Sequence, residues 1–239
     1  APFGSTGRAV PLNAALENDL PALAASVSAT TLAVSLVNPH NPSGTVNDAE
    51  TFDRFIEQTS ARTLVIVDEA YLEYDDFARR SAIRFARTNA NVLVFRTLAK
   101  VYGLAGISLG YAVAPTALAR DLRAAGIGSP HSLNRLALVA AEAALGDQAH
   151  VQHVVTRVRN NRAQLHAALD ALGLTHSDSR ANFVFFQSPT DAAAVRSALQ
   201  TRGIVPGRAF PPLDQWIRIT VGNETETRST IAALREIYA

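Results

Sequence analysis

The chain has 239 residues, of which 48% are hydrophobic and 18% charged, so it is long enough to bury a sizeable core. Its formal net charge is +1 and its arginines are scattered along the length, which argues against nucleic acid as the main partner. The absence of cysteine excludes disulfides and thiolate metal sites, and no apolar run approaches the roughly 20 residues that a membrane helix needs.

Three short apolar runs, at residues 32–37, 64–67 and 92–95, each end abruptly in polar residues. Runs without polar alternation predict strands that are covered on both faces, as in a parallel sheet. Helical patterns at 48–57 and 78–88 separate the runs, which favours βαβ crossovers. The carboxyl ends of the three strands should therefore meet at one edge of the sheet, where such folds bind ligands.

The rest of the chain predicts more helix and then a smaller α+β unit. Helices are expected at 116–125 and 132–145, followed by a long amphipathic helix at 148–172. Strands at 182–186 and 217–221 alternate with helices at 191–202 and 224–238. We therefore predict a large domain over residues 1–148 and a small domain over 149–239.

Lys100 is the single lysine among 22 basic residues. Arginine stays protonated and forms no imine, whereas a partly desolvated lysine amine can attack a carbonyl. Lys100 would share the edge of the sheet with Asn41 and Asp68, which follow the first two strands. Two alternatives stay open: a stray lysine in an arginine-favouring genome, and ordinary turn and cap roles for the two polar residues.

Six motifs occur in an order that is similar to one known family. They are Asn38-Pro-His-Asn-Pro-Ser-Gly44, Asp68-Glu-Ala-Tyr71, Arg96-Thr-Leu-Ala-Lys100, Tyr102-Gly-Leu-Ala-Gly106 with Leu109-Gly-Tyr111, Ala181-Asn-Phe-Val184 and Trp216-Ile-Arg-Ile-Thr-Val-Gly222. The order resembles that of fold-type I aminotransferases that use pyridoxal phosphate, in the class I/II branch that contains histidinol-phosphate aminotransferase. The resemblance runs from about Arg8 to the C-terminus. It implies an α/β fold: the three-layer, mostly parallel sheet of the large domain, here incomplete, followed by the small α+β domain.

The resemblance also implies roles for the residues that match the motifs. Lys100 would form a Schiff base with the cofactor and then act as general base. Asp68 would keep the ring nitrogen protonated, Asn41 and Tyr71 would bind the ring hydroxyl oxygen, and Thr97 would bind the phosphate. Turn geometry for Asn41 and core packing for Tyr71 are the alternatives. Glu69 points to the opposite side of its strand and is expected to be structural.

The sequence departs from the family around the phosphate. Ala99 replaces the usual serine before the lysine, and Ser108 replaces an arginine eight residues after it. The loss of an arginine fork should remove on the order of 1.5–3 kcal/mol and weaken cofactor binding roughly ten- to a hundredfold.

Substrate-binding residues are expected in the small domain. Arg218 matches the family arginine that binds a substrate carboxylate, and Asn182 would lie beside it. Arg208 could bind a distal anionic group such as a phosphate, although a surface role suits it equally well. A solvated strand arginine is the alternative for Arg218.

Residues 8–12 resemble a strand that comes late in the first third of the family sequence, so about a hundred residues of the family pattern precede this chain. We expect the sheet to have an open edge beside residues 32–37. His150 and His153 lie one helical turn apart without an evident third ligand, and the six histidines predict no metal site.

The favoured function is a pyridoxal-phosphate-dependent aminotransferase acting on a small-molecule amino donor, such as histidinol phosphate, and a 2-oxo acid. A decarboxylase with the same cofactor is one alternative, and a catalytically silent relative or fragment is another. The chain shows no export leader, so a cytoplasmic protein is expected. The resemblance implies a homodimer, without a membrane or nucleic-acid partner.

Overall fold

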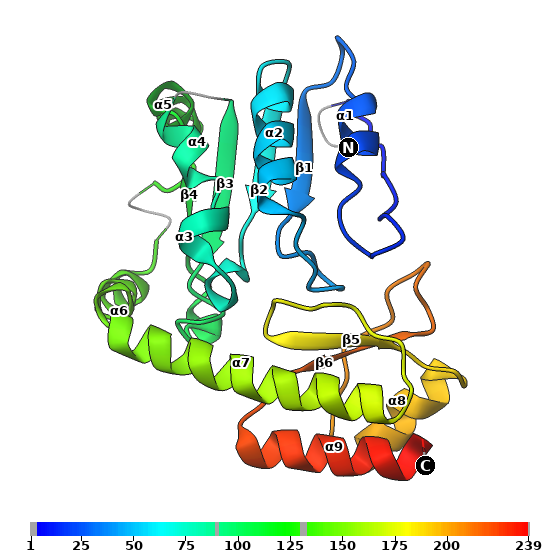
Figure 1. Ribbon diagram of the computed structural model, residues 1–239. Helices are drawn as coiled ribbons and strands as arrows, with labels where there is room; N and C mark the ends of the chain where they lie inside the picture. The colour runs from blue at the N-terminus through cyan, green and yellow to red at the C-terminus, as the bar shows by residue number, and fades with distance from the viewer. Residues whose placement is uncertain (1–3, 89–90, 130–132, 239) are drawn as a thin grey trace.

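The fold contains two sheets, which helix α7 (Gln148–Ala171) connects (Figure 1). A computed structural model describes residues 4–88, 91–129 and 133–238. The larger sheet has the order β1-β2-β3-β4, in which β1 (Ala33–Val37), β2 (Leu64–Asp68) and β3 (Val92–Thr97) run parallel. The three predicted strands are confirmed. The fourth strand, β4 (Gly110–Val113), is antiparallel to β3 and has no counterpart in the sequence prediction.

One face of this sheet is buried. Helices α1 (Leu20–Ala25), α2 (Ala49–Ser60) and α4 (Ile83–Arg87) supply side chains to the core on that face. Asp48 starts α2 because its carboxylate accepts a hydrogen bond from the amide of Thr51. The strands contribute to this core the side chains of Val34, Leu36, Val65, Val67, Val92 and Val94.

The opposite face of the sheet is more open than the sequence predicts. Ala33 and Ser35 of β1 are exposed there, and Phe95 of β3 is 43% exposed. Helices α5 (Thr116–Ala124) and α6 (Arg135–Gly146) reach this face beside β4, where they line an apolar groove of about 700 Å³. The prediction that all three runs are covered on both faces is therefore wrong for β1, which is also an edge strand as expected.

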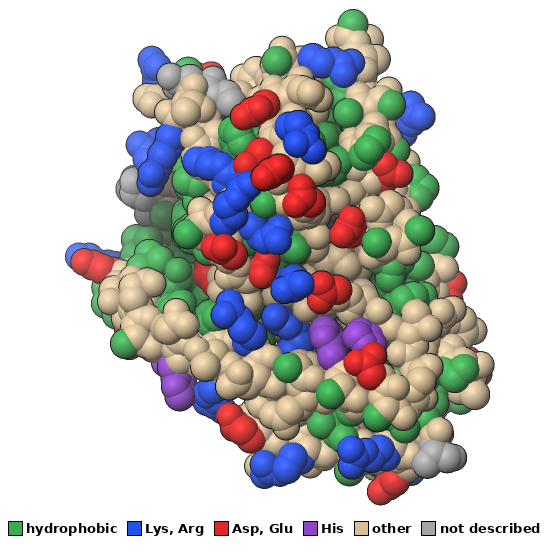
Figure 2. Space-filling view, in the orientation of Figure 1, with side chains coloured by type: hydrophobic (Ala, Val, Ile, Leu, Met, Phe, Trp, Pro, Cys, Tyr) green, Lys and Arg blue, Asp and Glu red, His purple; other side chains and the backbone are tan. Residues whose placement is uncertain are grey.

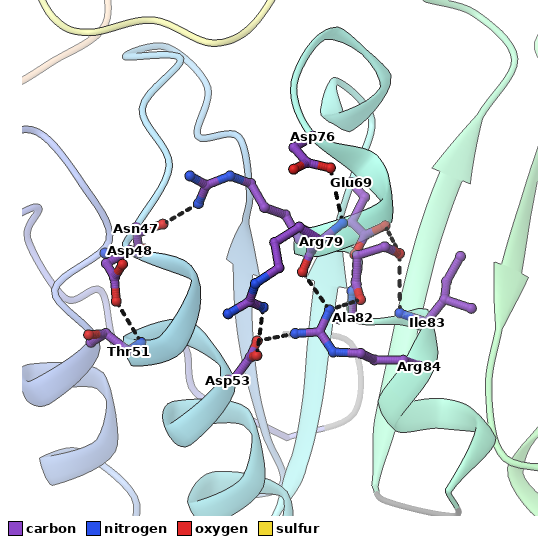
Figure 3. A network of polar contacts seen from close by, with 12 residues as sticks. Asn47, Asp48, Thr51, Asp53, Glu69, Asp76, Arg79, Ala82, Ile83 and Arg84 are labelled. Atoms are coloured by element: carbon purple, nitrogen blue, oxygen red, sulfur yellow. Dashed lines mark hydrogen bonds and ion pairs between the residues drawn. The ribbon is translucent and has the colours of Figure 1, made fainter.

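The helix predicted over 78–88 is divided into α3 (Phe77–Arg80) and α4. The break has a physical cause, because Ser81 has an extended backbone and its hydroxyl donates to Glu69 Oε2 at 2.8 Å. The amide of Ala82 donates to Glu69 Oε1 at 2.6 Å (Figure 3). A buried carboxylate thus takes the Ser81 hydroxyl and the Ala82 amide, the second of which a continuous helix would use internally, an arrangement that helical periodicity does not reveal.

Charged side chains of both signs cover the surface of α2, α3 and α4 (Figure 2). Arg79 and Arg84 both bind Asp53 of α2 (Figure 3), and Arg80 binds Asp75 at 2.8 Å. Surface pairs of this kind add little stability individually, but Arg79 of α3 and Arg84 of α4 align the two helices over α2 through Asp53.

The strand expected at residues 8–12 is not formed. Arg8 and Ala9 are exposed, and Leu12 makes only an isolated antiparallel bridge with Asn18. Among the described residues no strand lies beside this segment, and a strand without a partner leaves its amides unpaired. Ser132, the predicted start of the helix over 132–145, lies outside the described residues, and α6 begins at Arg135.

The smaller sheet pairs β5 (Phe183–Gln187) antiparallel with β6 (Trp216–Thr220). Helices α8 (Ala192–Thr201) and α9 (Glu224–Tyr238), both expected from the sequence, and the second half of α7 cover one face of it. The first half of α7 packs elsewhere, because Val151 and Val155 contact a cluster that contains Tyr71 and Val101. Helix α7 therefore contributes to the core of the small sheet and to this separate cluster. No helix among the described residues is long and apolar enough to cross a membrane.

Candidate active site

Asp68 and Lys100 follow adjacent strands at one edge of the larger sheet. Asp68 ends β2, its backbone carbonyl accepts from the amide of Asn38, and its carboxylate accepts from the amide of Ala70 at 2.9 Å. Lys100 follows three residues after the end of β3 and is half-buried. The predicted convergence of the three strand ends at one edge is confirmed by the parallel register of β1, β2 and β3.

A continuous series of side-chain contacts leads from Lys100 to the small sheet. The amine of Lys100 lies 5.3 Å from the ring centroid of Tyr71, whose ring packs edge to face with Phe183 at 5.2 Å. The guanidinium carbon of Arg218 lies 5.0 Å from the Phe183 ring centroid, and Arg218 Nη1 donates to Asn41 Oδ1 at 2.5 Å. Four residues predicted from separate motifs are thus linked in one series of contacts that passes through Phe183.

Arg218 is held with part of its donor capacity unused. Its guanidinium also lies over the ring of Phe210 at 5.1 Å, and its Nε is buried without a hydrogen-bond partner. Burial lowers the pKa of Arg218, although the group stays a cation at neutral pH. A half-buried guanidinium whose donors are not all paired is suited to a planar anion such as a carboxylate. Arg218 is half-buried and donates to Asn41, and its part in carboxylate binding stays a prediction.

Thr97 and Ser108 lie at the ends of the loop that carries Lys100. Thr97 ends β3, and its hydroxyl accepts from the amide of Ala99 at 3.1 Å. The amide of Leu98 donates to Leu109 O at 3.0 Å, which closes the loop next to Ser108. Ser108 is exposed and has a left-handed backbone, with φ of 52°. Both hydroxyls lie near the strand end, while their part in phosphate binding stays a prediction.

Asn182 and Arg208 lie farther along the small unit. The backbone carbonyl of Asn182 accepts from the amide of Val221 at 2.9 Å, which joins the start of β5 to the end of β6. Arg208 is exposed, and its guanidinium lies over Phe210 at 4.5 Å and donates to Ala209 O. Phe183 and Phe210 are absent from the sequence prediction, although Phe183 stands inside the Ala181–Val184 motif that contributed Asn182.

A buried ion triad lies on the other face of the same strand ends. Arg96 binds Glu69 at 2.9 Å and Glu73 at 2.5 Å, and its guanidinium lies 4.5 Å from the ring centroid of Phe77. All three charged side chains are at most 9% exposed. Burial raises the pKa of Glu69, against the opposing charge of Arg96. The expected structural role of Glu69 agrees with this position, directly after Asp68 and on the opposite side of the strand.

His40 lies in the loop that carries Asn41, and its Nδ1 is hydrogen-bonded to Ser43 Oγ at 2.9 Å. Burial lowers the pKa of His40 to about 4, whereas an unfolded histidine titrates near 6.5. Between these values the unfolded chain binds more protons, so the free energy of unfolding falls on acidification, by about 2 kcal/mol at pH 5 from this group. We expect His40→Gln to reduce the loss between pH 7 and pH 5 by about that amount, measured by urea unfolding.

The control for this pH prediction is His150→Gln, at an exposed residue in the first turn of α7. In that variant, the free energy of unfolding should differ between pH 7 and pH 5 by the same amount as in the wild type. An unchanged difference in His40→Gln would contradict the assigned cause.

His166 and His176 form a stacked pair, with ring centroids 4.6 Å apart, that sequence spacing does not suggest. Both nitrogens of His176 are engaged, by Asp170 and by the backbone carbonyl of Ser177. Across the described ranges no group of three or more histidine, aspartate or glutamate residues is placed to hold a metal ion. His131 lies outside those ranges.

The fold and the site define a protein of the fold-type I aminotransferase class. The family model described as "Aminotransferase class I and II" matches residues 4–234, and the chain belongs to this family. The relatives it matches include a histidinol-phosphate aminotransferase of Moorella thermoacetica, 36% identical over 93% of this chain and 58% of the relative. Another is the histidinol-phosphate aminotransferase of Symbiobacterium thermophilum, 38% identical over 98% of this chain and 64% of the relative.

Solved structures agree on the fold. The histidinol-phosphate aminotransferase of Sinorhizobium meliloti, solved with pyridoxal-5'-phosphate, is 30% identical and superimposes with a TM-score of 0.84. The superposition includes 96% of this chain and 63% of that structure's chain. The predicted fold class is confirmed, and the chain spans about three fifths of the length of these relatives.

Proposed function

We propose that this chain carries the lysine and carboxylate-binding parts of a pyridoxal-phosphate-dependent aminotransferase. The reaction would move an amino group between an amino acid or amino-phosphate donor, such as histidinol phosphate, and a 2-oxo acid. The observation that carries this proposal is the series of contacts from the Lys100 amine through Tyr71 and Phe183 to Arg218. It joins an amine that can form an imine to a cation that can bind a carboxylate.

The residues present suit the cofactor. One carboxylate oxygen of Asp68 accepts from Ala70, and among the described residues no hydrogen bond is made by the other, which leaves an acceptor for a protonated ring nitrogen. The Lys100 amine likewise has no hydrogen-bond or ion-pair partner among those residues, apart from the face of Tyr71. Asn41 and Tyr71 would orient the ring through its hydroxyl oxygen, and Thr97 and Ser108 would contact the phosphate.

Pyridoxal phosphate, when bound, supplies an electron sink for the bond that breaks at the substrate α-carbon. Asp68 would hold a proton on the ring nitrogen by favouring the charged form. Lys100 Nζ would take the proton from the α-carbon and return it to the adjacent carbon of the cofactor. Arg218 would fix the substrate carboxylate so that the α-carbon faces Lys100.

The remaining assignments concern substrate choice and assembly. Arg208, exposed beside Phe210, would meet a distal anionic group, and Asn182 would lie beside the carboxylate. The division into domains 1–148 and 149–239 is part of the proposal, and the two separate cores support it. A homodimer is also part of the proposal, and the exposure of Leu136 (78%) and Val139 (64%) on α6 supports it. A cytoplasmic location stays a prediction.

The test is to titrate the purified chain with pyridoxal phosphate, reduce it with borohydride and locate the adduct by peptide mass spectrometry. We expect a visible absorption band and a stable adduct on Lys100, together with amino transfer from histidinol phosphate to 2-oxoglutarate. A colourless protein without an adduct would overturn the proposal and favour the silent relative. An adduct with carbon dioxide release and no amino transfer would favour the decarboxylase.

A further inference from the structure

Phe183 is packed between groups that come from both sheets. It is the first residue of β5 and is 2% exposed. Its ring contacts Tyr71, which follows β2, at 5.2 Å and an interplanar angle of 86°. The guanidinium of Arg218, on β6, lies 5.0 Å from the same ring centroid. No other aromatic ring among the described residues has contacts with both Tyr71 and Arg218.

The loop that carries Asn41 also packs against this ring. Gly44 has φ of +73°, and a Cβ atom built there would lie 3.1 Å from Phe183 Cε2 and 2.0 Å from Ser179 Oγ. The amide of Arg180 donates to Gly44 O at 2.7 Å, and Ser177 Oγ donates to Ser43 O at 2.6 Å. The absence of a side chain at Gly44 therefore allows the loop to reach Phe183.

The position of the ring is itself fixed. The carbonyl of Phe183 accepts from Ser179 Oγ at 2.5 Å, and the residue pairs with Thr220 in the β5-β6 ladder. A buried phenyl ring on a paired strand can change its place only if its neighbours move. Tyr71 and Arg218 are consequently set at a distance that the ring determines.

We propose that Phe183 is a positioning residue that sets Arg218 relative to Tyr71 and Lys100. This inference rests on the proposed function and deepens it. The face of the ring attracts the guanidinium, and its edge-to-face packing holds Tyr71, so one side chain orients the carboxylate-binding group and a cofactor-binding group together. A branched aliphatic side chain fills similar space without either orientation.

The test compares Phe183→Leu with Phe186→Leu. Phe186 is on the same strand and fully buried, but its side chain packs in the small-unit core on the opposite face. We expect Phe183→Leu to raise KM for 2-oxoglutarate roughly tenfold and to change kcat less than about threefold, as for a loss of ground-state carboxylate binding. Phe186→Leu should lower the thermal midpoint without altering KM.

A second measurement does not depend on turnover. The dissociation constant of 2-oxoglutarate, determined by calorimetry without added cofactor, reports on Arg218 and should rise in Phe183→Leu and in Phe183→Met, whose side chains are similar in volume to each other. Equal constants in wild type, Phe183→Leu and Phe186→Leu would overturn the positioning role, as would two Phe183 variants that fail to fold while Phe186→Leu folds. If the wild type binds 2-oxoglutarate but acquires no adduct on Lys100, the proposed function fails. The calorimetric dissociation constants of the variants still decide the positioning role of Phe183 in that case.

Discussion

Lys100→Arg is expected to abolish both the visible band and amino transfer, with a fall in kcat of roughly 10⁴-fold or more, as when a catalytic nucleophile is removed. The substitution keeps the positive charge over the face of Tyr71, but a guanidinium stays protonated and forms no imine. Peptide mass spectrometry after borohydride reduction should show no adduct at position 100. Because Lys100 is the single lysine, the N-terminal amine is the one other primary amine that could react.

The control for this prediction moves the lysine rather than deleting it. Arg123 is exposed in α5, so Lys100→Arg combined with Arg123→Lys restores one lysine at a site without Asp68 or Tyr71 nearby. We expect no band from this double variant at cofactor concentrations that saturate the wild type. An equally intense band in either variant would falsify the assignment of Lys100.

Much of the fold could be predicted from the sequence because the patterns that indicate its strands and helices are local. The apolar runs and the Asp48 cap specify β1, β2, β3 and α2 whatever surrounds them. Burial is a property of the surroundings, so the open face over Ala33 and Ser35 could not be deduced from strand composition. Strand β4 is short and pairs through Gly110, whose close approach to Arg96 O leaves no room for a Cβ.

The site shows the same division between local and distant signals. Motif order selected Asn41, Tyr71, Lys100 and Arg218, and the structure links the Lys100–Tyr71 contact to the Arg218–Asn41 contact through Phe183. Phe183 was overlooked because an apolar residue on a strand is expected to be core, and its role arises from contacts with two other elements. Pairing between distant positions, such as that of Arg96 with Glu69, leaves no periodic trace in the sequence.

Those buried charges support the strand ends that carry the proposed chemistry. Glu69 follows Asp68 directly, and Arg96 precedes Lys100 by four residues, so the ion pair ties β2 to β3 on the face opposite the site. We expect Arg96→Met to lower the free energy of unfolding by about 3–5 kcal/mol, because Glu69 and Glu73 then stay buried without a counter-charge. The measurement is urea unfolding at pH 8 and at pH 5.

The pH dependence distinguishes this cause from lost packing. Without Arg96, the folded-state pKa of Glu69 and of Glu73 rises further above the unfolded value. The folded variant then binds more protons than the unfolded chain, so its free energy of unfolding is highest at low pH and falls as pH rises through the folded-state pKa. The deficit of Arg96→Met should therefore be larger at pH 8 than at pH 5. Arg202→Met, which breaks the exposed pair with Glu236, should cost less than about 1 kcal/mol at both pH values. Equal losses in the two variants would show that burial of the triad contributes no more than a surface ion pair does.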